Sequence, residues 1–220
     1  MTRIGRTSLI TTAAAVGVFF LLLALDPVVY RALDPSAASR RALEEKDWYW
    51  LLRITGTYWT WLVVALALIC IDLAPRSARV QPNAWRRGLF VLAAAAASGL
   101  GAELLKLIVA RERPAVLQDG VLVYQGPVFR GLFSGFAEGS NLGFPSSHAA
   151  TAFGGAFALA MLAPAVGPLV LLLACGCALT RLLTGAHFAT DVYGGIVLGF
   201  LAAWGLARPF GVRSPRKGTA

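Results

Sequence analysis

Two histidines and one aspartate are the residues of this sequence best suited to nucleophilic and acid–base chemistry. His148 and His187 are the only histidines in the chain, and Asp191 follows His187 by four positions. Residues four apart on a helix are neighbours, so the Asp191 carboxylate can hold one imidazole nitrogen of His187. That contact would fix the tautomer and leave the other nitrogen free to attack. The spacing therefore predicts a nucleophile at His187.

Three basic residues accompany these groups along the chain: Lys106, Arg113 and Arg181. Lys106 and Arg113 are seven positions apart, which is two helical turns, so both could face one cavity. The planar fork of arginine fits phosphate oxygens, and lysine supplies a point charge. Together they predict a site for a multiply charged oxyanion.

Segment 144–148 (FPSSH) predicts the start of a helix. Pro145 suits a first turn, where its missing N–H is not needed, and Ser146 can cap the helix. The free N–H groups near Ser146 and Ser147 would then point towards an anion. His148 would lie at this anion site, where it could give a proton to a leaving oxygen.

The composition places these polar residues in a protein whose surroundings are mostly lipid. The chain has 220 residues, of which 57% are hydrophobic and 14% charged, whereas soluble domains carry about 25% charged residues. Its mean hydropathy is +0.67. The net charge of +9 falls largely in short loops and tails. No basic stripe interleaved with aromatic residues follows any segment, so we expect no nucleic-acid partner.

Three cysteines lie inside apolar runs, at Cys70, Cys175 and Cys177. Cys175 and Cys177 are two positions apart, so on a helix they point in different directions. We expect all three to be small buried hydrophobic residues rather than metal ligands or a disulfide.

Six apolar segments could cross a bilayer, whose core of about 30 Å needs about 20 helical residues. The first could be a signal peptide, but a retained helix is favoured because no small-x-small cleavage site follows its long apolar run. We therefore expect an all-α fold, a six-transmembrane-helix bundle in a single domain over 1–220, with its motif core at about 88–207. The six segments are 8–25, 57–73, 88–110, 146–163, 167–183 and 187–207.

Loop charges predict the orientation of this bundle, because cytoplasmic loops are enriched in lysine and arginine. The N-terminal tail, loop 74–87 and the C-terminal tail would share one side, which we expect to be cytoplasmic. The ionisable residues of four helices then gather at the opposite, outer face, and charges at membrane depth mark functional sites. The basic residues that set this orientation are Arg3, Arg6, Arg76, Arg79, Arg86, Arg87, Arg208, Arg213, Arg216 and Lys217.

Two segments on the expected outer side, 36–56 and 115–144, give less specific indications of their roles. Segment 36–56 is expected to form an interfacial amphipathic helix between the first and second spans, with Ser36 as its cap and aromatic residues at headgroup depth. We interpret it as a membrane anchor without a catalytic role. The Gly-rich loop 115–144 could cover the site or be a solvated connector.

Three charged residues near Lys106 have other expected roles. Glu103 lies one turn before Lys106 and could pair with it. Arg111 and Glu112 border the outer interface, where we expect them to contact headgroups or solvent.

Three spaced motifs resemble the signature of the type 2 phosphatidic acid phosphatase superfamily. They are Lys106-x6-Arg113-Pro114, Pro145-Ser146-Ser147-His148 and Arg181-x5-His187-x3-Asp191. The family reads K-x6-R-P, P-S-G-H and S-R-x5-H-x3-D. Order and spacing match, and with the six-helix plan the resemblance covers nearly the whole chain. Ser147 replaces the usual glycine but keeps its backbone N–H, and Thr180 replaces a serine but keeps a hydroxyl.

The resemblance implies a role for each matched residue. His187 would attack phosphorus and form a phosphohistidine, while Asp191 would hold and polarise His187. His148 would protonate the leaving alcohol and then activate water. No metal and no cofactor are implied. The phosphate oxygens would be held by Lys106, Arg113, Ser146, Ser147 and Arg181.

The expected function is a metal-independent lipid phosphate phosphatase, at the periplasmic or extracellular face of a bacterial inner (cytoplasmic) membrane. Its substrate would be a lipid phosphomonoester or diphosphate: phosphatidic acid, phosphatidylglycerol phosphate, undecaprenyl diphosphate or a lipid A phosphate. The size and helix count also resemble bacterial lipid A 1-phosphatases. A phosphotransferase that passes the phosphoryl group to a lipid would use the same residues. A non-enzymatic anion carrier would need the histidines only as ligands, and no internal repeat supports a transporter.

Overall fold

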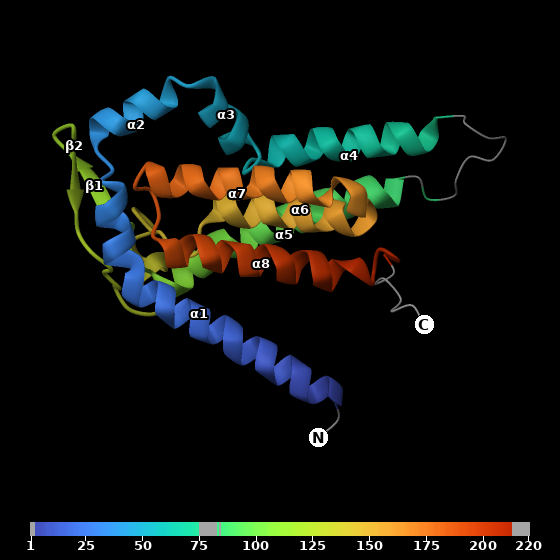
Figure 1. Cartoon of the computed structure of the whole chain (residues 1–220), viewed down its shortest axis with the longest axis horizontal. Coiled ribbons are helices and arrows are strands. Elements are labelled where there is room, and N and C mark those ends of the chain that lie inside the picture. Colours follow the sequence, from blue (N-terminus) through green and yellow to red (C-terminus); the bar gives the residue numbers. More distant parts are fainter. Residues whose placement is uncertain (1–2, 75–82, 84, 213–220) are drawn as a thin grey trace.

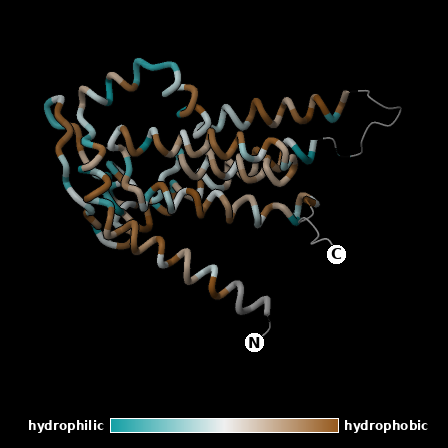
Figure 2. The backbone as a smooth tube through the Cα atoms, viewed as in Figure 1, coloured by the Kyte–Doolittle hydropathy of each residue, from teal (hydrophilic) through white to brown (hydrophobic). Residues whose placement is uncertain are grey.

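Six long helices make up most of the molecule (Figure 1). The fold is that of a computed structural model, which describes residues 3–74, 83 and 85–212, with side chains from residue 9 onward. Hydrophobic residues follow the long helices, and hydrophilic residues gather in the segment that joins α1 to α4 (Figure 2). The long helices are α1 (Arg3–Leu33), α4 (Tyr58–Leu73), α5 (Trp85–Val109), α6 (Ser147–Leu162), α7 (Gly167–Leu183) and α8 (Ala189–Ala207).

The number of predicted membrane spans is only partly supported. Among the described residues, four helices are long and apolar enough to cross a membrane: Leu9–Leu33 of α1, α5, Pro164–Leu183 and α8. The pair of α3 (Asp47–Ile54) and α4 qualifies only as one span bent by 68°, which would make five. α6 has 16 residues, or about 24 Å of helix, and is too short to qualify. The chain is a helical membrane protein, but six spans are more than these lengths support.

Small residues let α6 pack closely against its neighbours, of which α5, α7 and α8 make the most extensive contacts. A Cβ added at Gly154 would lie 2.7 Å from the Ala94 carbonyl oxygen of α5, and one at Gly199 of α8 would lie 2.7 Å from the Gly154 nitrogen. The Ser98 hydroxyl of α5 donates to the Ala150 carbonyl of α6 over 2.8 Å. Such close approach is typical of membrane helices with small residues at their interface. It fixes the N-terminal end of α6, where His148 lies.

Helix α1 diverges from the other helices towards its N-terminal end (Figure 1). Only 6% of its apolar window is buried within the protein. Asp26, near its C-terminal end, is in contrast only 1% exposed. Tyr193 of α8 donates to the Ala15 carbonyl over 3.0 Å. α1 therefore presents most of its surface to lipid and carries one buried charge into the bundle.

The segment between α1 and α4 forms two short helices where one was predicted. These are α2 (Ala37–Glu44) and α3, separated at Glu45 and Lys46. Ser36 caps α2 as expected: its hydroxyl accepts from the Ser39 N–H over 3.0 Å, and the Ser36 N–H donates to the Ser39 hydroxyl over 2.8 Å. α3 packs against α7, which brings this segment over the end of the bundle.

A two-stranded antiparallel hairpin departs from the expected all-α fold. It joins β1 (Ala115–Gln118) to β2 (Val121–Tyr124) within the Gly-rich loop 115–144, for which the sequence allows both a cover over the site and a solvated connector. Asp119 and Gly120 form the two-residue turn with φ of 49° and 80°, the backbone that an Asp-Gly hairpin turn favours. Tyr124 stacks on Tyr30 of α1 with ring centroids 4.7 Å apart. The hairpin therefore packs beside the C-terminal end of α1.

The helix ends fall into two groups at opposite ends of the bundle (Figure 1). Leu73, Trp85 and Ala207 end or begin their helices at one end, and the hairpin with α2 lies at the other. At the first end Arg87 pairs with Asp72 over 2.7 Å. Several basic residues used to predict the cytoplasmic side lie outside the described residues, and of Arg3 and Arg6 only the backbone is described; those outside are Arg76, Arg79, Arg213, Arg216 and Lys217.

Candidate active site

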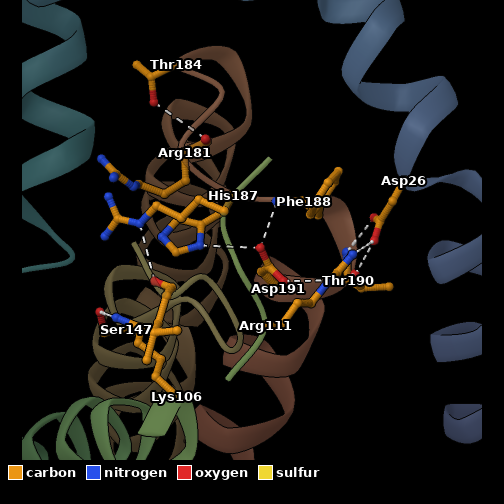
Figure 3. Close-up of polar contacts among 12 residues, drawn as sticks. Asp26, Lys106, Arg111, Ser147, Arg181, Thr184, His187, Phe188, Thr190 and Asp191 are labelled. Carbon is orange, nitrogen blue, oxygen red and sulfur yellow. Dashed lines mark hydrogen bonds and ion pairs between the residues drawn. The ribbon is translucent and has the colours of Figure 1, made fainter. Parts of the chain in front are cut away.

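The predicted site residues gather at the hairpin end of the bundle, on four separate parts of the chain. Figure 3 shows Lys106 and Ser147 on one side of His187, Arg181 on another, and Asp191 beyond the imidazole ring. The local order of the chain explains this arrangement, because α5 and α7 end here while α6 and α8 begin here.

His187 lies in the turn before α8, whereas the sixth predicted span began at this residue. α8 begins at Ala189, and Asp191 is in its first turn. The His187 Nδ1 atom lies 3.6 Å from the Asp191 Oδ2 atom, with side chains 2% and 0% exposed. That separation is longer than a hydrogen bond, and within the described residues Nδ1 has no hydrogen-bond partner. The carboxylate faces the imidazole at close to hydrogen-bonding distance.

Burial sets the charge state of His187. It lowers the pKa of the imidazole well below its ordinary value of 6.5, and the positive charges of Arg181, Arg113 and Lys106 lower this pKa further. The ring is therefore neutral at neutral pH. Only a neutral imidazole has a free lone pair for attack on phosphorus.

Lys106 ties α5 to the beginning of α6. Its ammonium donates to Glu103 Oε1 over 2.8 Å and to the Ser147 hydroxyl over 2.9 Å. The predicted pair between Glu103 and Lys106 is therefore confirmed. The Ser147 side chain thus makes a contact that glycine at this position would not provide.

Arg113 lies just beyond the end of α5, as expected from a third span that ends near residue 110. α5 ends at Val109, and Ala110 turns the chain with φ of 50°. The Arg113 N–H donates to the Asn141 carbonyl over 3.0 Å, and its Nε donates to the Leu142 carbonyl over 3.3 Å. Burial, followed by the charge of Arg40, lowers the pKa of the Arg113 guanidinium. The pairing with 141–142 replaces the helix in positioning this cation.

The start of α6 differs in detail from the prediction. Ser146 is the N-cap residue, but its side chain makes no capping hydrogen bond, and its buried hydroxyl has no partner among the described residues. Pro145 precedes the cap and lies outside the first turn. The Ser146 N–H instead donates to the Asp191 carbonyl over 2.8 Å, which joins α6 to α8. The first N–H groups of α6 remain without intrahelical partners, as at any helix start.

Two arginines at the site have unpaired guanidinium nitrogens. The Nε atoms of Arg181 and Arg53 are buried without a hydrogen-bond partner in the described part of the chain. Arg53 belongs to α3, and its guanidinium lies over the Trp50 ring, 4.9 Å from the centroid. The Cys177 thiol contacts the Arg53 carbonyl at 3.7 Å and the His148 carbonyl at 4.0 Å. α3 therefore packs beside His148, a position that the interpretation as a simple anchor missed.

Arg111 corrects a second expectation. It was assigned to headgroup or solvent contacts, yet its side chain is 1% exposed and lies between Asp26 and Asp191. The reason is its two carboxylate partners, which lie 85 and 80 residues away in the sequence. No local pattern reports such contacts, although an aspartate at the end of a long apolar run is itself unusual.

Comparisons with known proteins agree with the motifs. A family model described as the PAP2 superfamily matches residues 87–213, more than half of the chain. The fold is similar to the crystal structure of the first transmembrane PAP2 type phosphatidylglycerolphosphate phosphatase from Bacillus subtilis, with a TM-score of 0.51 and 19% identity, over 93% of this chain and 98% of that one. No curated protein matches the sequence. The resemblance seen in the three motifs is thus confirmed, and the chain belongs to the PAP2 superfamily.

Proposed function

We propose that this chain is an integral membrane lipid phosphate phosphatase that works through a phosphohistidine at His187. The observation that carries the proposal is a buried imidazole that lies 3.6 Å from the Asp191 carboxylate and among the charges of Arg181, Arg113 and Lys106. Family membership supports a phosphatase, and the apolar helices support a membrane enzyme. The phosphotransfer step and the role of each residue are proposed from the site itself.

In the first step the His187 Nε2 atom attacks phosphorus, because Nδ1 faces Asp191. The bond between phosphorus and the leaving oxygen breaks, and that oxygen keeps the electron pair and takes a proton from the protonated imidazole of His148, a form that the negative charge of the bound phosphate would stabilise. In the second step His148 accepts a proton from water, and the resulting hydroxide releases inorganic phosphate from His187. This use of one residue as acid and then as base is ordinary general acid–base catalysis.

The cations would stabilise the charge that develops on the phosphoryl oxygens, usually the largest catalytic contribution. Among the described residues, Arg53, Arg113 and Arg181 make no salt bridge with a carboxylate, so their charge is available to a substrate. Arg53 joins the predicted phosphate-binding set on this basis. The set is Arg53, Lys106, Arg113, Arg181 and the amides near Ser146 and Ser147.

The substrate would be a lipid phosphomonoester or diphosphate reached from the outer leaflet. Phosphatidic acid, phosphatidylglycerol phosphate, undecaprenyl diphosphate and lipid A phosphates all present the required group. The solved structure of similar fold is that of a phosphatidylglycerolphosphate phosphatase, which makes that lipid the first to assay. We place the enzyme in a bacterial inner membrane with both termini cytoplasmic.

A panel assay with purified protein tests the proposal. Wild-type protein should release inorganic phosphate from at least one of the four lipids, and His187→Ala should lose activity by at least about 10³-fold, as removal of a catalytic nucleophile does. Arg87→Gln, at the far end of the bundle, is the matched control and should stay within about twofold of wild type, as expected of a surface pair. Wild-type phosphate release by His187→Ala would refute the nucleophile.

The same assay tests metal independence and the acceptor. Within the described residues no group of three or more His, Cys, Asp or Glu could hold a metal ion, and we predict unchanged activity in EDTA. Loss of activity in EDTA that Mg²⁺ or Zn²⁺ restores would contradict this prediction. A phosphotransferase would be favoured if phosphorylated lipid, not inorganic phosphate, accumulated when an acceptor lipid was added.

A further inference from the structure

A row of three buried charged side chains leads from α1 to the candidate nucleophile. Asp26, Arg111 and Asp191 have side chains that are 0%, 1% and 0% exposed. Figure 3 shows Arg111 between the two aspartates, with Asp191 next to His187. Arg111 occupies one of the unspecified positions within the K-x6-R-P motif, and Asp26 lies outside the matched family region. Neither belongs to the signature.

Arg111 bridges the two carboxylates with separate nitrogens. Its Nη1 donates to Asp191 Oδ1 over 2.8 Å, and its Nη2 donates to Asp26 Oδ2 over 2.7 Å. Asp26 is held in turn by Thr190, whose N–H donates to Asp26 Oδ1 over 3.0 Å and whose hydroxyl donates to Oδ2. The guanidinium also lies 4.4 Å from the centroid of the Phe188 ring. Hydrogen bonds therefore hold Asp26, Arg111 and Asp191 in fixed positions relative to one another.

These contacts orient the Asp191 carboxylate towards His187. Oδ1 is occupied by Arg111, while Oδ2 accepts the Phe188 N–H over 2.8 Å and faces His187 Nδ1. A carboxylate with two fixed donors cannot rotate away from the imidazole. An arginine without Asp26 would lose one of its two anchors, and Asp191 without Arg111 would be a buried carboxylate with a single N–H donor.

Stability alone is a weak reason for such a row. Buried ion pairs cost desolvation, and well-packed apolar replacements are often neutral or stabilising. α1 is otherwise mostly exposed to lipid, and it places its buried charge at the catalytic end of the bundle. The row carries one net negative charge, which would favour the positive charge that the ring of His187 acquires as it attacks phosphorus.

We propose that Asp26 and Arg111 are positioning residues that hold the Asp191 carboxylate ionised and aimed at His187. α1 thereby completes the site, although its sequence lies outside the family region. This inference rests on the proposed function, because it assigns a task within the same reaction. Neither residue touches the substrate, so the expected defect is in turnover and not in substrate binding.

Kinetics of three purified variants test the inference. Asp26→Asn should lower kcat by roughly 10- to 100-fold, the range seen when an outer hydrogen-bond partner that orients a site residue is lost. KM should stay within about threefold. Arg111→Lys keeps the charge but cannot bridge both carboxylates as a fork, so its kcat should also fall. The rate of phosphoenzyme formation, measured by rapid quench, should fall by the same factor. Thr190→Val preserves shape and removes only the hydroxyl, which accepts from Arg111 and donates to Asp26, and it should lower kcat several-fold.

Arg130→Gln is the matched control. It breaks the pairs of Arg130 with the partly buried Glu112 and with the exposed Glu138. It leaves Asp26, Arg111 and Asp191 in place, so kcat should stay within about twofold of wild type. If Asp26→Asn does not fold, Thr190→Val and Arg111→Lys decide the question. Wild-type kcat in the folded variants would overturn the inference. If His187→Ala were inactive in that same experiment, the proposed function would stand and only the positioning role would fail.

Discussion

At the scale of single residues, the site depends on keeping one imidazole neutral among cations. The orientation of the Asp191 carboxylate is fixed, because both of its oxygens accept hydrogen bonds. Lys106 and Ser147 show the same principle, because their contact joins two helices at the phosphate-binding end. Each of these residues acts in a position that another residue holds.

The charge state of His187 gives a prediction at this scale. Burial and nearby cations lower its pKa below 6.5, so the neutral ring should persist as pH falls through 6.5 and protonate only at clearly lower pH. Because the chain has two histidines, ¹⁵N-histidine NMR in detergent micelles should show two sets of ring signals. His187→Gln removes one set and assigns the other. A His187 midpoint at or above 6.5 would contradict the electrostatic description of the site.

The sequence predicted individual contacts well where the two residues are close together in the chain. The spacing of His187 and Asp191, the pairing of Glu103 with Lys106 and the cap at Ser36 all depend on residues three or four positions apart. Arg111 was misplaced because its partners Asp26 and Asp191 are distant in sequence, and burial by distant segments leaves no local pattern.

At the scale of elements, short segments position the site as much as the long helices do. The loop after α5 places Arg113 by pairing with 141–142, and α3 brings Arg53 beside His148. The hairpin of β1 and β2 packs on Tyr30 of α1. Its Asp119-Gly120 turn is a recognisable signal, but two strands of four residues are short enough to be hidden in a Gly-rich loop.

Arg53 gives a prediction at the scale of elements. Its guanidinium is held over Trp50 with a buried Nε that has no hydrogen-bond partner in the described part of the chain. Arg53→Gln should raise KM for the best lipid phosphate by about 10-fold, the loss expected for one charge-assisted hydrogen bond. Arg53→Lys should give an intermediate KM. Arg87→Gln serves again as control, and an unchanged KM in Arg53→Gln would remove α3 from the substrate site.

At the scale of the whole molecule, the bundle separates a lipid-facing scaffold from one polar end. Small residues hold α5, α6 and α8 close together, and this fixes the helix ends from which the site residues come. Composition and hydropathy predicted that scaffold. They also predicted six spans, of which length and composition support four in the described part of the chain, or five with α3 and α4 counted as one bent span. The short α6 is packed among α5, α7 and α8, and a helix buried in protein can be shorter than one that faces lipid.

In the proposed mechanism the whole fold serves one chemical event, transfer of a phosphoryl group to His187. The most direct test is to mix purified protein with a ³²P-labelled lipid phosphate, quench within milliseconds and locate the label by peptide mapping. The label should be on His187, stable in alkali and lost in acid, as a phosphoramidate is. It should be absent from His187→Ala. In His148→Gln it should form more slowly, because the acid is missing, and persist longer, because the base for hydrolysis is missing. Label on another residue, or turnover without a phosphorylated protein, would contradict the central claim.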